Sequence, residues 1–214
     1  MTLGEQLDTI RDRTMQTVRG LAAWQEVMER LEAGAIEAGA LAVGAPITPF
    51  LLPDSWGRLV SSDELLAAGP LVISFFRGDW CPWCSITLEH LQQALPAIEA
   101  AGARLVALIA DTGGRLTETR SRHGLSFDLL CDVDHAVALQ FGIAFRLPAL
   151  YRAGLAANRI DLAVRHGHDG WFVPVPATYV VDREGIVRHR FLDIDYTRRP
   201  EPEAIVEAVK ALSY

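Results

Sequence analysis

The chain has 214 residues, of which 50% are hydrophobic and 22% are charged, so it can bury a packed core and is not globally disordered. This length fits one domain, or one domain with additions. The formal net charge of −7 argues against nucleic acid as a partner. No apolar run approaches the roughly 18 residues that span a bilayer, so we expect no membrane partner either.

Composition and the first residues also indicate a compartment. Residues 1–20 alternate charged and apolar side chains and lack the apolar stretch of a signal peptide, so we expect a cytoplasmic protein. Three cysteines are too few for a disulfide-stapled secreted scaffold. In a reducing compartment, a paired-cysteine motif indicates chemistry rather than a structural bridge.

The first forty residues are predicted to be helical and to extend a main domain that covers residues 41–214. Apolar side chains recur at helical spacing in two runs that break near Gly20: Leu3, Leu7 and Ile10, then Trp24, Val27, Met28 and Leu31. Such stripes are packing surfaces. They can pack on their own domain or on a second copy, so a homodimer stays open.

The main domain opens with a proline-containing segment that excludes helix and central strand. We expect an edge hairpin within residues 47–60 and a short helix over 64–68, capped by Ser62 or Asp63.

Strands and helices then alternate along the chain. Buried strands are predicted at residues 71–76, 104–110 and 127–130, and helices at 84–100, 111–122 and 134–142. Asp111 or Thr112 is expected to cap the second of these helices, and Asp134 the third. This order predicts an α/β fold with a central mixed sheet flanked by helices.

The last part of the chain completes that sheet. A hairpin is predicted from residues 177–181 and 186–191, followed by a helix that opens at Pro200 and Pro202. Residues 143–173 are too long for a plain connection, so we interpret them as an insertion with one helix at 149–157.

The most informative motif is Trp-Cys-Pro-Trp-Cys at residues 80–84, between a predicted buried strand and a helix. Two cysteines three apart on a first helical turn can close a disulfide with little backbone movement. Free N–H groups and the positive end of the helix dipole stabilise a thiolate, which is the reactive form. Arg77 adds a second positive charge just upstream. The motif predicts a redox-active pair, Cys81 and Cys84.

Two other interpretations of the pair are weaker. Zinc prefers four ligands, and the chain has no second matched cysteine pair, since Cys131 and the histidines lack ligand spacing. Two inert buried cysteines are the other alternative. No G-x-G-x-x-G or Walker pattern is present, so we expect neither a nucleotide cofactor nor a metal.

Residues 75–84, Phe-Phe-Arg-Gly-Asp-Trp-Cys-Pro-Trp-Cys, resemble the peroxiredoxin-like branch of the thioredoxin superfamily, the alkyl hydroperoxide reductase/thiol-specific antioxidant group. Further segments are similar to that family's opening and later segments: 43–46, 50–54, 127–132 and 175–182. The resemblance covers about residues 41–212. It implies a thioredoxin-like fold and thiol redox chemistry.

The chain departs from this family at the predicted site. Peroxiredoxins carry Pro-x-x-x-Thr-x-x-Cys; with Cys84 in that cysteine's place, Cys81 replaces the threonine and Arg77 the proline. The family's later arginine falls at or next to Pro176. Val175-Pro176 instead resembles the cis-proline step of thioredoxins. We therefore expect a peroxiredoxin-like body with a thioredoxin-like site, the insertion lying just before a cis-proline strand.

The resemblance implies three functions, of which we prefer the first. A thiol peroxidase would reduce hydrogen peroxide or organic hydroperoxides, form a Cys81–Cys84 disulfide and be recycled by a thioredoxin-like reductant. A thiol–disulfide oxidoreductase would attack a substrate disulfide with Cys81. A redox sensor would only change shape. Family register favours Cys84 as the nucleophile, whereas position at the helix end and expected exposure slightly favour Cys81.

Other residues have ordinary structural interpretations. Cys131 ends an apolar strand and is expected to be a buried structural thiol. His166 and His168 are expected in a solvated loop that contains glycine. Residues 196–199 are expected to form a surface turn or a dimer contact. Three tryptophans are predicted either to form an apolar wall around the pair or simply to pack in the core: Trp80, Trp83 and Trp171.

Overall fold

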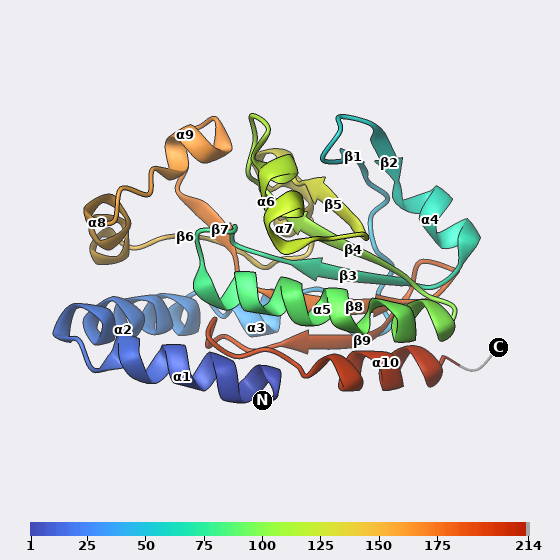
Figure 1. Cartoon of the computed structure of the whole chain (residues 1–214), viewed down its shortest axis with the longest axis horizontal. Helices are drawn as coiled ribbons and strands as arrows, with labels where there is room; N and C mark the ends of the chain where they lie inside the picture. Colours follow the sequence, from blue (N-terminus) through green and yellow to red (C-terminus); the bar gives the residue numbers. More distant parts are fainter. Residues whose placement is uncertain (213–214) are drawn as a thin grey trace.

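A computed structural model describes residues 1–212 of the chain, and a five-stranded mixed sheet forms its centre (Figure 1). The strand order is β5-β4-β3-β8-β9. The first three pair in parallel, and β8 and β9 are antiparallel to their neighbours. The bounds are β3 Leu71–Phe75, β4 Arg104–Ile109, β5 Asp128–Cys131, β8 Ala177–Val181 and β9 Val187–Leu192. The predicted mixed sheet is confirmed.

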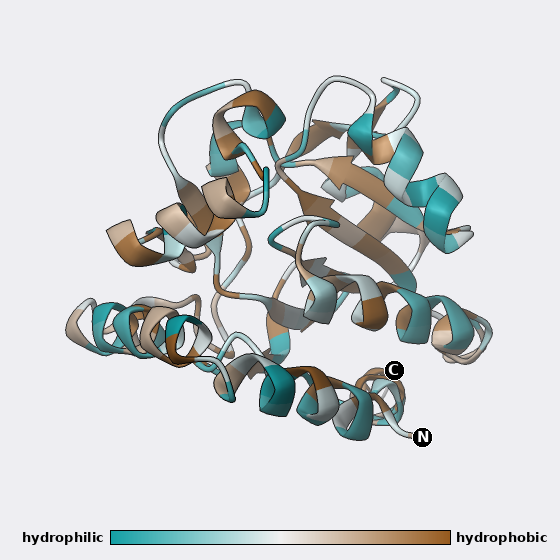
Figure 2. Cartoon of the chain, turned by 60° about the vertical axis from the view of Figure 1, so that its left-hand side comes forward, coloured by the Kyte–Doolittle hydropathy of each residue, from teal (hydrophilic) through white to brown (hydrophobic). Residues whose placement is uncertain are grey.

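Helices cover both faces of this sheet because its central strands are apolar throughout. In β3, alternate residues enter two separate cores: Val72 packs on one face, and Leu71 and Ile73 pack on the other. The first face carries α5 (Pro82–Ala100), α6 (Arg115–His123) and α10 (Pro202–Lys210), and the second carries α4 (Ser62–Ala68) and α7 (Ala136–Gln140). Figure 2 shows the apolar strands enclosed by helices whose outer sides are hydrophilic.

The N-terminal helices pack on this same chain. They are α1 (Leu3–Met15), α2 (Val18–Ala33) and the short α3 (Ile36–Gly39). Leu3 and Leu7 are buried in the core beside α5. The backbone N–H groups of Leu3 and Gly4 donate to the Glu201 carboxylate at 3.1 and 2.7 Å, which ties α1 to the start of α10. The helix break lies at Thr17 rather than Gly20, because the Thr17 hydroxyl caps α2.

The burial of Leu3 gives a testable prediction. Leu3→Ala is expected to lower the free energy of unfolding by about 2–5 kcal/mol, because it removes apolar contacts and leaves a cavity. Val18→Ala, at a position 88% exposed, is the control and should stay within about 0.5 kcal/mol. Urea unfolding followed by circular dichroism measures both. Equal stability of the two variants would mean that α1 is not part of the cooperative unit.

The insertion holds more structure than the one predicted helix. That helix, α8 (Ala149–Ala157), has the predicted bounds and packs against α2. A second helix, α9 (Leu162–His166), follows it, and β6 (Ala144–Arg146) pairs with β7 (Phe172–Pro174). The short ladder closes the two ends of the insertion against each other.

Helix starts account for most of the local differences from prediction. α5 begins at Pro82 rather than Cys84, with Cys81 as its N-cap. α6 begins at Arg115, after Gly114 in the left-handed conformation. The segment before α7 is held by Asp132 rather than Asp134, since the Asp132 carboxylate accepts the N–H groups of Val137 and Ala138.

The predicted edge hairpin is confirmed, but the predicted cap of the next helix is wrong, because α4 begins at Ser62 and its N-cap is Ser61 rather than Ser62 or Asp63. The hairpin pairs β1 (Leu51–Pro53) with β2 (Leu59–Ser61), and the Ser61 hydroxyl caps α4. Within residues 1–212, no helix has the length and apolar character needed to cross a bilayer.

The prediction of a cis-proline step is wrong. The Val175–Pro176 peptide bond is trans. The Val175 N–H donates to the Ile143 carbonyl at 2.8 Å, which continues the β6–β7 ladder to the residue before Pro176. The site loses the feature that made it resemble a thioredoxin in particular.

Candidate active site

Cys81 and Cys84 lie where β3 gives way to α5. Cys81 is the N-cap of the helix, Pro82 is its first residue, and the Cys84 N–H donates to the Cys81 carbonyl at 2.9 Å. The two thiols are unlinked, and both are buried, at 1% and 0% exposure. The expectation that Cys81 is the more exposed thiol is therefore wrong, and exposure does not distinguish the two.

Gly78 lets the loop before the pair turn back tightly. Its φ of +139° lies in a region that side chains rarely adopt, and a Cβ at this position would collide with the Trp80 indole. The Trp80 ring is thereby held against the loop, over the guanidinium of Arg77.

Arg77 is fully buried beside the pair, at 0% exposure. Three rings surround its guanidinium, with centroids 5.0, 4.8 and 4.3 Å away: Trp80, Tyr151 and Tyr196. We call these rings the aromatic cage. Within residues 1–212 no carboxylate forms an ion pair with Arg77, and none of its three guanidinium nitrogens makes a hydrogen bond of normal geometry. Aromatic faces offset part of the cost of this buried charge. A nearby anion would offset the remainder.

Arg199 brings a second guanidinium to the same place. Its Nη1 donates to the carbonyl of Tyr196 at 2.6 Å, and its Nη2 lies 3.7 Å from the Cys84 Sγ. The backbone carbonyls of the turn before α10 thus aim this cation at one thiol of the pair. The expectation of a plain surface turn at residues 196–199 is wrong, because Tyr196 and Thr197 are buried.

These positive charges make the pKa values of the two thiols different. Burial opposes ionisation of Cys84, but the hydrogen bond from Cys81 and the positive charges of Arg199 and Arg77 outweigh it and lower the pKa of Cys84 to about 5. Burial, the hydrogen bond to Cys84 and the charge on Cys84 raise the pKa of Cys81 well above its ordinary value. At neutral pH the pair therefore holds one thiolate, on Cys84, and one thiol, on Cys81.

An ion-pair network holds the loop between β3 and α5 through Asp79. The Asp79 carboxylate binds Arg165 and Arg122, both at 2.6 Å, and Arg165 also binds Asp111 at 3.1 Å. Burial raises the pKa of Asp111 to about 6, although the charge of Arg165 opposes this. The insertion, through Arg165, is in this way attached to the loop that carries the cysteines.

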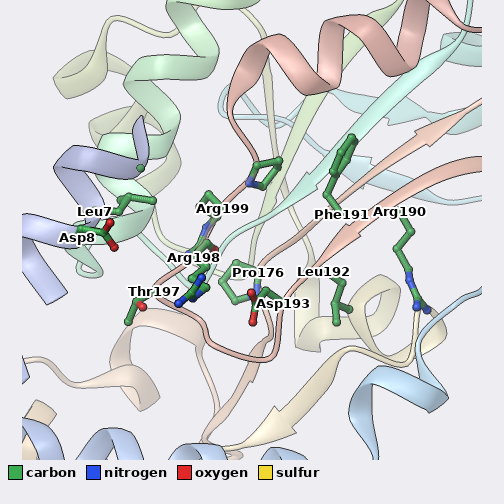
Figure 3. A pocket seen from close by; sticks show the side chains of 12 residues that line it. Leu7, Asp8, Pro176, Arg190, Phe191, Leu192, Asp193, Thr197, Arg198 and Arg199 are labelled. Carbon is green, nitrogen blue, oxygen red and sulfur yellow. Dashed lines mark hydrogen bonds between the residues drawn. The ribbon is translucent and has the colours of Figure 1, made fainter. Parts of the chain in front are cut away.

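A cavity of about 450 Å³ opens beside Arg199, and Figure 3 shows Pro176 and Arg199 on its walls. Leu7 of α1 and Thr197 contribute to the same lining. The cavity reaches Arg199, whose other side touches the Cys84 thiol. Neither cysteine lines the cavity, so the Arg199 side chain separates it from the buried thiol.

The remaining sequence candidates divide between the site and other places. Trp83 is buried edge-to-face against Tyr196, so it supports the aromatic cage. Trp171 stacks near Arg152 instead. Cys131 is buried as expected, its thiol donates to the Asp111 carbonyl, and burial raises its pKa to about 11. The histidines do not form a solvated loop, since His166 is buried.

The comparisons with known proteins agree with this architecture. The model of the AhpC/TSA family matches residues 43–190. Peroxiredoxin Q, chloroplastic, from Oryza sativa subsp. japonica is 26% identical over 178 residues, which are 83% of this chain and 69% of that protein. Peroxiredoxin Bcp of Escherichia coli (strain K12) is 29% identical over 94 residues, which are 44% of this chain and 60% of that protein.

A solved structure has the same fold. The crystal structure of Peroxidoxin BcpB from Mycobacterium tuberculosis superposes with a TM-score of 0.64 at 20% identity, covering 81% of this chain and 99% of that one. Because the family model spans more than half of the sequence, the assignment does not rest on this likeness alone. The chain therefore belongs to the AhpC/TSA family and is a peroxiredoxin-like oxidoreductase with a thioredoxin-like fold.

Proposed function

We propose that this protein is a thiol peroxidase that uses Cys84 as its nucleophile and Cys81 as the resolving thiol. One observation carries the proposal: Cys84 is the thiol of lowered pKa, beside the guanidinium groups of Arg199 and Arg77. A thiolate attacks peroxide oxygen, and guanidinium groups stabilise the charge that moves onto the leaving oxygen. These two arginines would replace the family's later arginine, which is absent next to Pro176.

The chemistry balances within the pair. The Cys84 thiolate attacks one oxygen of ROOH, the O–O bond breaks, and RO⁻ leaves and takes up a proton to give an alcohol, or water when R is hydrogen. Cys84 is then a sulfenic acid. The Cys81 thiol attacks its sulfur, an S–S bond forms and water leaves. An external dithiol, such as a thioredoxin-like protein, returns two electrons by exchange.

The disulfide itself gives a prediction. One equivalent of hydrogen peroxide is expected to link Cys81 to Cys84, because they sit three residues apart on one helical turn. Cys131 should stay free, since burial raises its pKa to about 11 and keeps it protonated. Alkylation of the remaining thiols followed by peptide mapping measures this. A bridge that contains Cys131 would contradict the assignment of the pair.

The decisive test of function is peroxide-dependent turnover with and without a thioredoxin system. A peroxidase consumes hydrogen peroxide or an organic hydroperoxide in many turnovers when the reductant is present. A thiol–disulfide oxidoreductase instead reduces insulin in the absence of peroxide; the trans Val175–Pro176 bond removes one thioredoxin-like feature of this alternative. A redox sensor would form the disulfide once and not turn over. Multiple turnovers with peroxide are the expected result.

The location and the oligomeric state stay predictions. We expect a cytoplasmic protein, because that compartment supplies the reducing thiols that the cycle needs. A homodimer stays open, and light scattering of the purified chain measures its molecular mass.

A further inference from the structure

Three of the six histidines gather on the far side of Asp111 from the cysteine loop. His135 follows β5, and His166 and His168 end α9 and begin the next loop of the insertion. One ring nitrogen from each lies within 4.8 Å of the other two. The His135 Nε2 and the His166 Nδ1 face each other at 3.4 Å. His135 and His166 are buried, and His168 is partly buried.

The two facing nitrogens are each other's hydrogen-bond partners, so an ion between them would replace that bond. His135 is hydrogen-bonded to the backbone of Phe172, which leaves its Nε2 turned toward the cluster. The other nitrogen of His166, Nε2, is buried without a hydrogen bond and lies 3.8 Å from an Asp111 oxygen that also has none. A histidine that binds a metal commonly donates its second N–H to a backbone carbonyl or a carboxylate. Phe172 and Asp111 are placed for those two roles.

The ligand type of this cluster favours a transition metal ion, because all three side chains offer an imidazole nitrogen. Neutral imidazole is the form that binds metals. Imidazole nitrogen favours Zn²⁺, Cu²⁺ or Ni²⁺ over Mg²⁺ or Ca²⁺, which prefer oxygen.

We propose that His135, His166 and His168 form a binding site for a divalent transition metal ion of the zinc type. Three protein nitrogens leave a fourth tetrahedral position for water. The ion would join the insertion to the end of β5 and so hold together two segments that are distant in sequence.

His168 is the weakest of the three ligands. Its Nδ1 accepts the Gly170 N–H at 3.0 Å, so the proton sits on Nε2. A metal ion on Nδ1 would replace this hydrogen bond directly. A metal ion on Nε2 would move the ring proton to Nδ1, which could then no longer accept the Gly170 N–H. We therefore expect the His166→Ala variant to lose more affinity than the His168→Ala variant.

The test must first remove the other metal-binding groups. Cys81 and Cys84 also bind Zn²⁺, so the parent for this experiment is a variant with all three cysteines changed to serine. Zn²⁺ titration by calorimetry is expected to show one site. Co²⁺ is expected to give the visible absorption of a tetrahedral nitrogen-rich site. Because the parent contains no cysteine, this absorption cannot come from a thiolate site. No Zn²⁺ or Co²⁺ binding by the folded parent would overturn the proposal.

Single variants in that parent locate the site. His135→Ala and His166→Ala are each expected to weaken Zn²⁺ binding by more than about tenfold, the lower end of the loss from removing even a supporting group. His189→Ala, on β9, is the matched control and should bind like the parent. Circular dichroism checks folding. Should the two buried variants not fold, His168→Ala decides, since its side chain is 27% exposed. Binding unchanged in His168→Ala and in any folded buried variant would contradict the proposal.

Discussion

Cys84→Ser is expected to abolish the reaction with peroxide, whereas Cys81→Ser should keep the first oxidation and lose turnover. The structure separates the two thiols by charge: Cys84 carries the lowered pKa, and Cys81 keeps its proton. Serine in place of Cys84 removes the only activated sulfur, because Cys131 is held protonated by burial. Serine in place of Cys81 still offers a hydroxyl to the thiolate, so Cys84 should be oxidised to a sulfenic acid that has no neighbour to resolve it.

A sulfenic-acid trap such as dimedone, followed by mass spectrometry, distinguishes these outcomes. The Cys81→Ser variant is expected to carry one adduct, on Cys84. Cys131→Ser is the control and should turn over peroxide like the unmodified protein. An adduct on Cys81 in the Cys84→Ser variant, with rapid peroxide consumption, would reverse the two roles.

The sheet could be predicted from the sequence because its strands are locally marked. Residues 71–75 and 177–181 are continuous apolar runs of strand length, and both form central strands with burial on both faces. The starts of the helices are harder to predict. Residues 111–112 and Asp134 are residue types that commonly cap helices, but the structure does not use them as caps. The N–H groups of Val137 and Ala138 donate to the carboxylate of Asp132 instead of Asp134.

The cysteine pair could also be predicted, since strand, motif and helix are contiguous. The groups that set its reactivity could not. Arg199 lies 115 residues from Cys84, in a turn whose sequence reads as solvated, and Tyr151 comes from the insertion. Only the fold brings them to Arg77. The same holds for His135, which has no spacing relation to His166. The local signal in the sequence is Arg77 itself, a charged residue that directly follows a predicted buried strand.

Arg199→Met is expected to raise the pKa of Cys84 and to slow its reaction with peroxide at neutral pH. The variant removes a positive charge 3.7 Å from the sulfur while burial still penalises the thiolate. With a pKa of about 5, the unmodified protein is almost fully ionised at pH 7, so its rate should be level above pH 6 and fall as the pH drops through 5. A return to the free-cysteine pKa of about 8.5 would leave about 3% thiolate at pH 7, which is a rate loss of about 30-fold.

Arg77 and the Cys81 hydrogen bond persist in that variant, so the loss should be smaller than this limit, and the midpoint of the pH profile should lie between about 5 and about 8.5. The pH profile of the first oxidation, followed by tryptophan fluorescence in stopped flow, measures the shift. Arg198→Met is the matched control, because the neighbouring guanidinium pairs with Asp195 rather than with the thiol and should leave the midpoint near 5. A midpoint in Arg199→Met equal to that of the control would mean that Arg199 does not stabilise the thiolate, and the activation of Cys84 would then fall to Cys81 and Arg77.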